Sequence, residues 1–495
     1  MVIFLILLSG LSFIGLSQNA GDLDSTFGIN GKLTTTLGTG DDFGWAVAVQ
    51  NDGKIIVGGF SQADFALVRY KQDGSLDYSF GNAGKVITNI GPGSVILSLK
   101  IQTDGKIVGA GWTMPTSNQY AFALARYNPD GSLDISFGDS GKVITSFGMG
   151  LNYGRALAIQ PDGKLLVTGE YGGWPCDYSI ARYNTNGSLD NSFGNGGIVI
   201  TNMGPGLNLP KAITVQNDNK IIVVGHAEPN MGIVRYNMDG TLDSTFGTGG
   251  KVFTSLGTDS YQTAVIMQPD NKILVAGNYS NGGAYHNAVF RYITDGDLDN
   301  SFGTSGITTA PTVYSDYPSS MILQENGDIV IAGTSYLFAY LYFELMKFDG
   351  NGIIVNSFGQ QGMVQTEFNH YDRCNGLALQ NDGKLVAAGY TDYNYGDQMF
   401  AVARYIGDIP LSLDRRKNNT IVLYPNPADD KINLEISALA GIADLSIFNP
   451  LGQMLIEYQI KDKKTQIDIS SLHSGVYFIS FINGKKIEFE KIIKN

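Results

Sequence analysis

The chain has 495 residues, too many for one ordinary hydrophobic core, so several domains or a repeat architecture are required. It contains 63 glycines, 11% aromatic and only 16% charged residues, which favours many short strands and tight turns over helices. Before residue 415 there are 22 basic and 37 acidic side chains, and from there on 11 and 9. The acidic main body argues against nucleic acid and anionic membrane surfaces as partners.

The chain begins with an apolar run from Val2 to Leu16 that is too short to span a bilayer. Small residues at Gly15 and Ser17 have the spacing of a cleavage site, which would leave Gln18 as the first mature residue. We predict a secretory signal peptide over residues 1–17 and no transmembrane span in the mature chain. No Lys or Arg precedes the apolar run, so an uncleaved anchor is the alternative.

Residues 18–409 contain seven copies of one pattern. A basic–aromatic pair recurs every 53 to 57 residues, beginning at Arg69, Arg126, Arg182, Arg235, Arg291, Lys347 and Arg404. A glutamine before a hairpin turn recurs in the same register, at Gln50, Gln102, Gln160, Gln216, Gln268, Gln324 and Gln380. A glycine always follows nine residues after that glutamine, as at Gly59 and Gly111. Constant spacing of this kind indicates a repeat architecture.

Each repeat unit contains four strand-like runs, here called A to D. In the third unit, strand A covers Arg155 to Gln160, and an Asp-Gly hairpin turn joins it to strand B, Lys164 to Gly169. Strands C and D cover Tyr178 to Tyr183 and Ile198 to Thr201. Four antiparallel strands in about 55 residues are typical of a propeller blade.

The phase of the repeat predicts a closed ring. A D-type strand, Lys32 to Thr36, precedes the first A strand, whereas the seventh unit stops after strand C at Tyr405. The N-terminal strand can therefore complete the last blade, which removes the open ends of the array. We predict an all-β fold: a seven-bladed β-propeller of four-stranded blades closed by an N-terminal strand.

The repeat resembles the delta-60 repeat family. The resemblance rests on stretches such as Asp130-Gly131-Ser132-Leu133-Asp134 and Ser136-Phe137-Gly138, and it covers roughly residues 20 to 405. Local departures occur at Asn219, at Asn271 and between Asp349 and Ile353. The resemblance implies a propeller scaffold and little about function, because scaffold residues carry it.

We expect no metal, cofactor or disulfide. The repeated aspartates lack the ligand density of a calcium loop, and the four histidines show no metal-ligand spacing; these aspartates are Asp77, Asp134, Asp190, Asp243 and Asp299. The Gly138 to Gly141 stretch looks like the surroundings of a serine nucleophile, but it recurs as a turn in other units. Cys176 and Cys374 lie three blades apart, too far for the Cα separation of about 7 Å that a disulfide requires.

Functional variation is concentrated on the face that carries the B–C and D–A connections, here called the variable face. The residue after each strand-B glycine differs in every unit: Phe60, Trp112, Glu170, His226, Asn278, Thr334 and Tyr390. A position fixed in geometry and variable in chemistry is expected of a recognition surface. Relaxed selection on exposed loop ends is the competing explanation.

All three tryptophans fall on this face in neighbouring blades, close to tyrosines and acids. Aromatic rings supply apolar area and acids orient a ligand, which suits a sugar or a protein segment. We predict ligand contacts from Trp112, Trp174, Trp45, Tyr120, Tyr171, Tyr178, Glu170 and Asp177. For Trp45, which shares strand parity with Val47 and Val49, packing between blades one and seven is the alternative.

Residues 410–420, with a basic run at Arg415-Arg416-Lys417, form a linker to a second domain. Short alternating apolar runs over 421–495 predict a small Ig-like β-sandwich. This segment resembles the C-terminal sorting domain of type IX secretion, on motifs that contain Tyr424, Pro425, Asn426, Pro427, Gly452, Gly475 and Tyr477. The resemblance implies recognition by outer-membrane export machinery, followed by release from, or attachment to, the outer surface of a Gram-negative bacterium.

We interpret the chain as an exported or cell-surface binding propeller without catalytic activity, with a polysaccharide or protein ligand. One alternative is a polysaccharide-active hydrolase or lyase that uses two carboxylates of the variable face. Acids found in single blades are the candidates for that role: Glu170, Asp177, Asp316 and Asp372. Another alternative is a structural surface component.

Overall fold

A computed structural model describes residues 18–116, 119–148, 150–173, 175–280, 283–310, 315–337, 339–392, 396–407, 421–436, 441, 443–449, 454–483 and 486–495. The predicted signal peptide and linker lie outside these residues. The chain divides into two compact units, Met1–Asp408 and Ile409–Asn495. The described residues contain strands and turns but no helix, and hence no helix that could cross a membrane.

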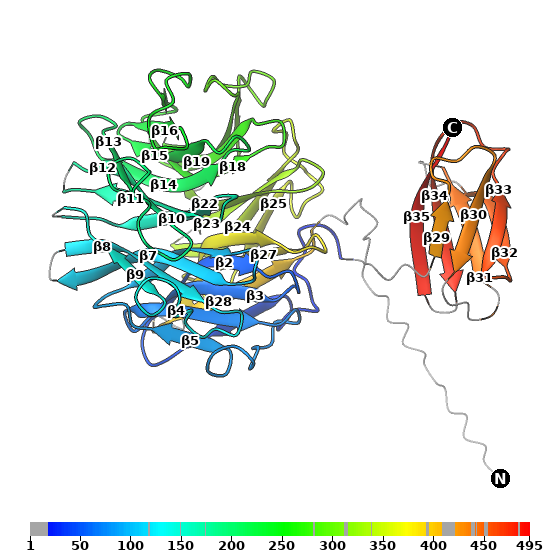
Figure 1. Cartoon of the computed structure of the whole chain (residues 1–495), viewed down its shortest axis with the longest axis horizontal. Coiled ribbons are helices and arrows are strands. Elements are labelled where there is room, and N and C mark those ends of the chain that lie inside the picture. The colour runs from blue at the N-terminus through cyan, green and yellow to red at the C-terminus, as the bar shows by residue number, and fades with distance from the viewer. Residues whose placement is uncertain are drawn as a thin grey trace, which may run out of the picture. The chain divides into compact units, whose positions relative to one another are not determined.

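The first unit is a ring of seven four-stranded antiparallel sheets (Figure 1). Blades 1 to 3 are β2 (Asp42–Val49), β3 (Ile55–Ser61), β4 (Asp64–Tyr70) and β5 (Lys85–Thr88); β6 (Val95–Ile101), β7 (Ile107–Thr116), β8 (Gln119–Tyr127) and β9 (Lys142–Thr145); β10 (Gly154–Ile159), β11 (Leu165–Tyr171), β12 (Asp177–Tyr183) and β13 (Ile198–Thr201). Blades 4 and 5 are β14 (Asn208–Val215), β15 (Ile221–Ala227), β16 (Asn230–Tyr236) and β17 (Lys251–Thr254); β18 (Asp259–Met267), β19 (Ile273–Ser280), β20 (Tyr285–Tyr292) and β21 (Ile307–Thr309). Blades 6 and 7 are β22 (Ser315–Leu323), β23 (Ile329–Leu337), β24 (Tyr340–Phe348) and β25 (Met363–Thr366); β26 (Arg373–Leu379), β27 (Leu385–Asp392), β28 (Gln398–Tyr405) and β1 (Lys32–Thr35).

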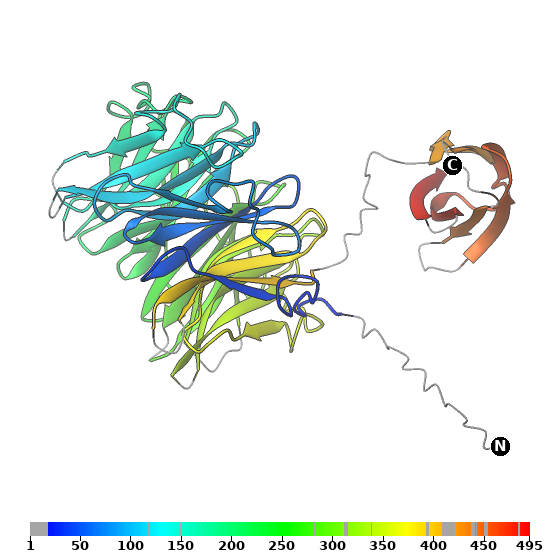
Figure 2. The same cartoon turned by 90° about the horizontal axis from the view of Figure 1, so that it is seen from below.

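The A strands form the inner ring, since each A strand contacts those of both neighbouring blades, and β2 of blade 1 contacts β26 of blade 7. Figure 2 shows the blue strands of blade 1 between the cyan strands of blade 2 and the yellow strands of blade 7. Apolar side chains interdigitate between blades; Ile56 and Leu67 of blade 1, for example, share a buried cluster with Ile96 of blade 2. The core is therefore a series of sandwiches between successive blades.

The predicted ring closure is confirmed. β1 pairs antiparallel with β28, from Lys32 opposite Ala403 to Thr35 opposite Phe400, and completes the seventh sheet. The segment before β1 also supplies the C–D corner of this blade, because Leu23 bridges to Tyr405 and the Phe27 ring stacks on Arg404. The two ends of the propeller are thus joined by a strand and by a corner.

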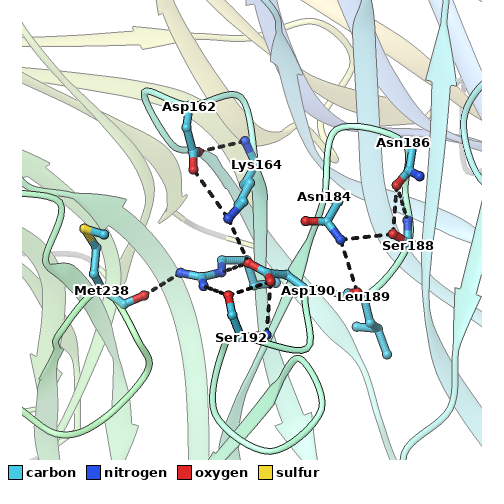
Figure 3. A network of polar contacts seen from close by, with 10 residues as sticks. Asp162, Lys164, Asn184, Asn186, Ser188, Leu189, Asp190, Ser192 and Met238 are labelled. Carbon is cyan, nitrogen blue, oxygen red and sulfur yellow. Dashed lines mark hydrogen bonds and ion pairs between the residues drawn. The ribbon is translucent and has the colours of Figure 1, made fainter.

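In the six blades that carry an arginine at the end of strand C, a charged corner links the blade to the next one, and Figure 3 shows this corner in blade 3. In blade 3, Arg182 Nε donates to Asp190 Oδ2 at 2.7 Å, and Lys164 Nζ lies 3.0 Å from the same oxygen. Ser192 Oγ donates to Asp190 Oδ1 at 2.7 Å. Arg182 Nη1 then donates to the carbonyl oxygen of Met238 in blade 4. The repeated Arg residues therefore hold neighbouring blades together and the Asp residues neutralise them, which explains why both recur along the chain.

Blade 6 keeps this corner with exchanged charges. The strand-B lysine is replaced by Asp328, the C-strand arginine by Lys347 and the corner aspartate by Val355. Lys347 Nζ lies 2.9 Å from Asp328 Oδ2. An opposite-charge pair therefore persists although both partners differ from the other blades.

In blade 7 the carboxylate of the corner comes from the N-terminal segment. Asp24 Oδ2 accepts from Arg404 Nε at 2.8 Å and lies 3.2 Å from Lys384 Nζ. Burial opposes ionisation, but hydrogen bonds from Thr26 and the charges of Arg404 and Lys384 outweigh it and lower the pKa of Asp24 to about 2.

The second unit packs two antiparallel sheets around one apolar core. One sheet contains β29 (Ile421–Tyr424), β30 (Lys431–Ile436) and β33 (Lys464–Asp468). The other contains β31 (Ala443–Phe448), β32 (Met454–Ile460), β34 (Gly475–Asn483) and β35 (Lys486–Lys494). This is the β-sandwich expected from the sequence.

The expectation of unpaired thiols is also confirmed. Cys176 and Cys374 are both free and buried. The core and the charged corners therefore stabilise the propeller without a disulfide.

Removal of residues 18–38 should open the ring. The deletion exposes the hydrogen-bonding edge of β28 and leaves Arg404 without its carboxylate, so the truncated protein should melt at a lower temperature and self-associate. Thermal melting and size-exclusion chromatography test this. An unchanged melting temperature in a monomeric truncated protein would contradict the closure model.

The Asp24→Asn variant should lower the free energy of unfolding by about 3 kcal/mol at pH 7, because it removes one partner of a buried ion pair. Since the pKa of Asp24 is lower in the folded chain, its stabilisation is complete above about pH 4 and is lost as the pH falls towards 2. The variant should therefore lack that part of the acid destabilisation in urea titrations. Asp22→Asn, the same change at an exposed site two residues away, should change stability by less than about 0.5 kcal/mol.

Candidate functional site

The variable position after each strand-B glycine lies beside the next blade and is buried in four of the seven blades. His226 Nδ1 lies 3.0 Å from the carbonyl oxygen of Ser260, and Asn278 Nδ2 donates to that of Asp316 at 3.3 Å. Thr334 Oγ1 accepts from the backbone N–H of Cys374 at 3.1 Å. In these blades the variable residue packs against, and hydrogen-bonds to, the next blade, so it does not form an open recognition surface. Phe60, Trp112 and Tyr390 are half-buried and keep part of their surface accessible.

Each A strand has a β-bulge at one position, five residues before the repeated glutamine. The register with strand B shifts in all seven blades, around Trp45, Leu97, Arg155, Lys211, Thr263, Ser319 and Asn375. All seven bulge side chains are half-buried at the inner edge of their sheets. Bulges re-aim side chains and often lie beside binding sites. The scaffold thus presents a ring of seven equivalent positions with different chemistry.

Three aromatic rings meet on blades 2 and 3. The Trp112 ring centroid lies 5.3 Å from those of both Tyr120 and Tyr153, in edge-to-face geometry, and the two tyrosine rings are 4.3 Å apart. All three residues are half-buried. Burial and a hydrogen bond with Tyr120 raise the pKa of Tyr153. We call Trp112, Tyr120 and Tyr153 the aromatic cluster; it offers apolar surface together with phenolic hydroxyl groups.

An ion pair adjoins the aromatic cluster. The Arg155 guanidinium lies over the Tyr153 ring at 5.1 Å, and its Nε and Nη2 contact Glu170 Oε1 at 2.8 and 2.6 Å. The Glu170 side chain is only 4% exposed, whereas that of Arg155 is 28% exposed. Lys211, the bulge residue of blade 4, is close enough for its charge to interact with both. Glu170 is therefore held in place by Arg155, as a buried carboxylate must be.

The remaining predicted contacts do not join this cluster. Tyr178 is fully buried, and its hydroxyl donates to the carbonyl oxygen of His226 at 3.1 Å, so we drop it from the candidate site. Asp177 Oδ1 accepts from Asn202, a bond that Asp64 repeats with Asn89 in blade 1, which identifies a scaffold contact. Tyr171 stacks with Phe147 at 6.0 Å. Trp174 lies outside the described residues.

Trp45 lies in a second cluster at the junction of blades 1 and 7, where its ring centroid is 6.0 Å from that of Tyr390. Phe43 contacts both Phe60, at 4.8 Å, and Tyr390, at 4.6 Å. Trp45 therefore contacts blade 7, as the packing alternative requires. Its half-buried state leaves part of the ring accessible.

A third aromatic row on blades 5 and 6 was missed by the sequence analysis. Tyr285 lies between Tyr261, at 6.2 Å, and Tyr317, at 5.6 Å, and Tyr317 is 42% exposed. No tryptophan marks these blades. Register was the available signal, because Tyr261 and Tyr317 occupy the same position as Tyr153, two residues before the bulge.

Three of the four candidate acids of an enzyme, Glu170, Asp316 and Asp372, are buried, and Asp177 is half-buried. Asp316 and Asp372 occupy a place, three residues before the bulge, that is polar and buried in all blades: Asp42, Ser94, Asn152, Asn208, Ser260, Asp316 and Asp372. Asp372 accepts from the backbone N–H groups of Phe368 and Asn369 and from Thr391, and so fixes the D–A loop. Together with the Glu170 ion pair, these contacts favour structural roles for the carboxylates. The described residues contain no group of three metal-ligating side chains.

Glu344 is an unusual buried acid that the sequence analysis also missed. It stands opposite Gly333, where the other blades have Ala, Ser or Gly, and it is 2% exposed. Asn287 Nδ2 donates to its Oε1 at 3.1 Å and Gln365 Nε2 to its Oε2 at 3.4 Å. Burial and the neighbouring Asp316 raise the pKa of Glu344 well above its usual value.

The described sorting-motif residues stabilise the β-sandwich. Asn426 joins the loop after β29 to the last strand: its Nδ2 donates to the carbonyl oxygen of Lys491 at 2.7 Å, and its Oδ1 accepts from the N–H of Ile493 at 2.9 Å. Tyr477 is buried, and its hydroxyl donates to the carbonyl oxygen of His473 at 2.8 Å. Tyr424 donates to Glu435, and Gly475 begins β34. Gly452 lies outside the described residues.

Comparisons with known families agree with this architecture. Six stretches match the family described as a domain of unknown function (DUF5122) beta-propeller: residues 50–80, 102–137, 160–193, 216–246, 268–302 and 380–405. Residues 422–495 match the secretion system C-terminal sorting domain. The predicted repeat family and sorting domain are thereby confirmed. No curated protein matches the chain.

A comparison with solved structures finds matches at low identity, with TM-scores below 0.5. A catalytically inactive virginiamycin B lyase from Staphylococcus aureus with quinupristin is 13% identical, with 75% of this chain and 98% of that chain covered and a TM-score of 0.43. A protein of unknown function from Dyadobacter fermentans is 10% identical, with 76% and 98% covered and a TM-score of 0.40. Sqt1 from Chaetomium thermophilum, bound to the N-terminus of ribosomal protein L10, is 11% identical, with 80% and 94% covered and a TM-score of 0.42.

The Glu344→Gln variant should gain stability relative to the wild type as the pH rises. Because the pKa of Glu344 is raised in the folded chain, the unfolded chain releases this proton first above about pH 4.5, and wild-type stability falls with pH. The variant lacks this loss, so urea unfolding at pH 4, 6 and 8 should show a difference that widens in its favour. Glu367→Gln, at an exposed site, is the control. A pH-independent difference would contradict the raised pKa.

Proposed function

We propose that this chain, which combines DUF5122 β-propeller repeats with a C-terminal secretion sorting domain, is an exported, non-catalytic glycan-binding protein. The sorting domain points to recognition by the type IX machinery and to an extracellular or cell-surface location. We place the mature protein at the outer surface of a Gram-negative bacterium, either attached or released. The β-sandwich then serves export and the propeller serves binding.

The aromatic cluster of Trp112, Tyr120 and Tyr153 is the observation that carries the binding proposal. Its ring centroids lie 4.3 to 5.3 Å apart, and all three residues are half-buried. In four other blades the residue at the position of Trp112 is buried. A rigid aromatic surface binds the apolar face of a sugar at low entropic cost, and adjacent polar groups orient the ring. The ion pair of Arg155 and Glu170 supplies such groups.

Binding is favoured over catalysis by the state of the acids. A glycosidase pair needs two carboxyl groups on either side of the scissile bond, about 5 to 9.5 Å apart, with one acting as a proton donor. Glu170 forms an ion pair with Arg155, and Asp372 accepts a backbone hydrogen bond that fixes the D–A loop of blade 7. A protein ligand would use the same aromatic surface, and a purely structural role would use none of it.

Purified full-length mature protein, screened against a glycan panel, separates these functions. We expect binding without turnover, with quenching of tryptophan fluorescence by the bound glycan. Product formation would favour the enzyme alternative, and absence of both would favour a protein ligand or a structural role.

The Trp112→Ala variant should lower glycan affinity at least about tenfold, equivalent to about 1.4 kcal/mol, because it removes the centre of the aromatic cluster. Trp45→Ala, the same truncation on blade 1, is the matched control and should bind as the wild type does. Isothermal titration measures both, and thermal melting confirms folding. Equal affinities of Trp112→Ala and wild type would remove this cluster as the site.

A further inference from the structure

Cationic side chains occupy two adjacent positions in the ring of bulge residues. Arg155 in blade 3 and Lys211 in blade 4 carry positive charge there, while the other five positions hold Trp, Leu, Thr, Ser and Asn. The main body of the chain has a strong excess of acidic residues. Two neighbouring cations at the inner edge of an acidic propeller therefore need a specific explanation.

Glu170 balances only one of these charges. Both contacts that Arg155 makes with Glu170 go to the same oxygen, Oε1, so the rest of the partly exposed guanidinium keeps free donors. Among the residues that the structure describes, no carboxylate lies within 4.0 Å of Lys211 Nζ. The half-buried Lys211 thus carries a charge without a direct counter-ion.

The pKa of Lys211 agrees with the lack of a direct counter-ion among the described residues. Burial and the charge of Arg155 lower the pKa of Lys211 to about 8, against the opposing effects of Glu170 and Cys176. A lowered lysine pKa means that the folded chain disfavours the ammonium form, and an anion bound beside it would relieve that cost. At neutral pH the lysine is still mostly protonated and able to bind an anion.

The aromatic cluster continues directly from these cations, because Arg155 lies over the Tyr153 ring. A ligand that covers both would present a flat apolar face to the rings and an anionic group to Arg155 and Lys211. A guanidinium binds carboxylate and sulfate groups with paired N–H donors. The acidic body repels densely charged chains such as nucleic acid, so anionic groups that are single or widely spaced fit best.

We propose that Arg155 and Lys211 bind the acid group of an anionic sugar residue, a uronic acid or a sulfated sugar, whose ring rests on the aromatic cluster. This inference rests on the proposed glycan binding and names the class of glycan. The Lys211 ammonium contacts the acid group, and Glu170 is a positioning residue that holds Arg155 in place.

Trigalacturonate and its carboxyl-reduced neutral form are matched probes for the full mature chain, and a sulfated oligosaccharide with its desulfated form tests the second source of charge. Wild type should bind at least one acidic probe about tenfold or more tightly than its neutral form. Lys211→Gln should abolish that preference by weakening binding of the acidic probe. Lys100→Gln, at another lysine of an inner strand, should keep the preference. We use Lys211 because loss of Arg155 would leave buried Glu170 unpaired.

The pH dependence gives a second readout. Wild-type affinity for the acidic probe should fall between pH 7 and 9 as Lys211 loses its proton, and Lys211→Gln should show no such fall. The other charged groups beside Lys211 are Arg155 and Glu170, and burial raises the pKa of the neighbouring Cys176 thiol above its usual value.

The outcomes separate the two proposals. Binding of neutral probes that depends on Trp112, without preference for acidic probes, contradicts this inference and leaves the proposed function standing. Binding of acidic probes that Lys211→Gln abolishes and Trp112→Ala does not affect supports the anion site and contradicts the role of the aromatic cluster. Failure to bind any of the probes contradicts both.

Discussion

The structure depends on the charged corner by which six of the blades bind the next one. An arginine of strand C is neutralised by an aspartate of its own blade and donates to a carbonyl oxygen in the following blade, as Arg182 does to Met238. Such a buried ion pair is stable only with all its partners present. Each arginine corner therefore needs a carbonyl oxygen of the next blade, and in blade 7 the N-terminal segment supplies the carboxylate, Asp24. The chain folds as a ring because the polar groups and the apolar faces of one blade find their contacts in the neighbouring blades.

A uniform corner leaves function to the positions that the scaffold does not need. The buried polar residue three positions before the bulge fixes the D–A loop in blade 7, as Asp372 shows, and the residue after the strand-B glycine contacts the next blade through His226, Asn278 and Thr334. The bulge residue is not required for either of these contacts, so its residue type can differ between blades, as Trp45 and Lys211 do. In blades 6 and 7 it still binds the neighbouring A strand, through Ser319 and Asn375. In blade 1 it packs against blade 7, through Trp45 and Tyr390, so the charged bulge residues of blades 3 and 4 are the ones available for recognition.

The repeat made the fold predictable, and the same repeat explains the errors at the site. Turn, glycine and Arg–Tyr positions sufficed for seven blades, their four strands and the closing strand. Trp112, Tyr120 and Glu170 were found because they lie on the variable face at or near the few tryptophans of the chain. Tyr178 was misassigned, although it stands four residues before Arg182, where Phe65 and Phe122 are buried before their own arginines. Arg155 and Lys211 were missed as site residues because each lies at a β-bulge. A bulge adds one residue to the strand and shifts its inside–outside alternation, and no residue type in the sequence marks the place where this happens.

Electrostatics explains how an acidic protein can hold an anion at one place. The excess negative charge lies in exposed aspartates such as Asp52, Asp104 and Asp162, which salt and water screen over about 10 Å. Arg155 and Lys211 are partly buried at the inner edge of the blades, where screening is weaker and local charge counts for more. The distant field therefore disfavours dense polyanions, whereas the nearby cations favour a single acid group. Selection between glycans would then depend on the spacing of charge along the chain rather than on its total amount.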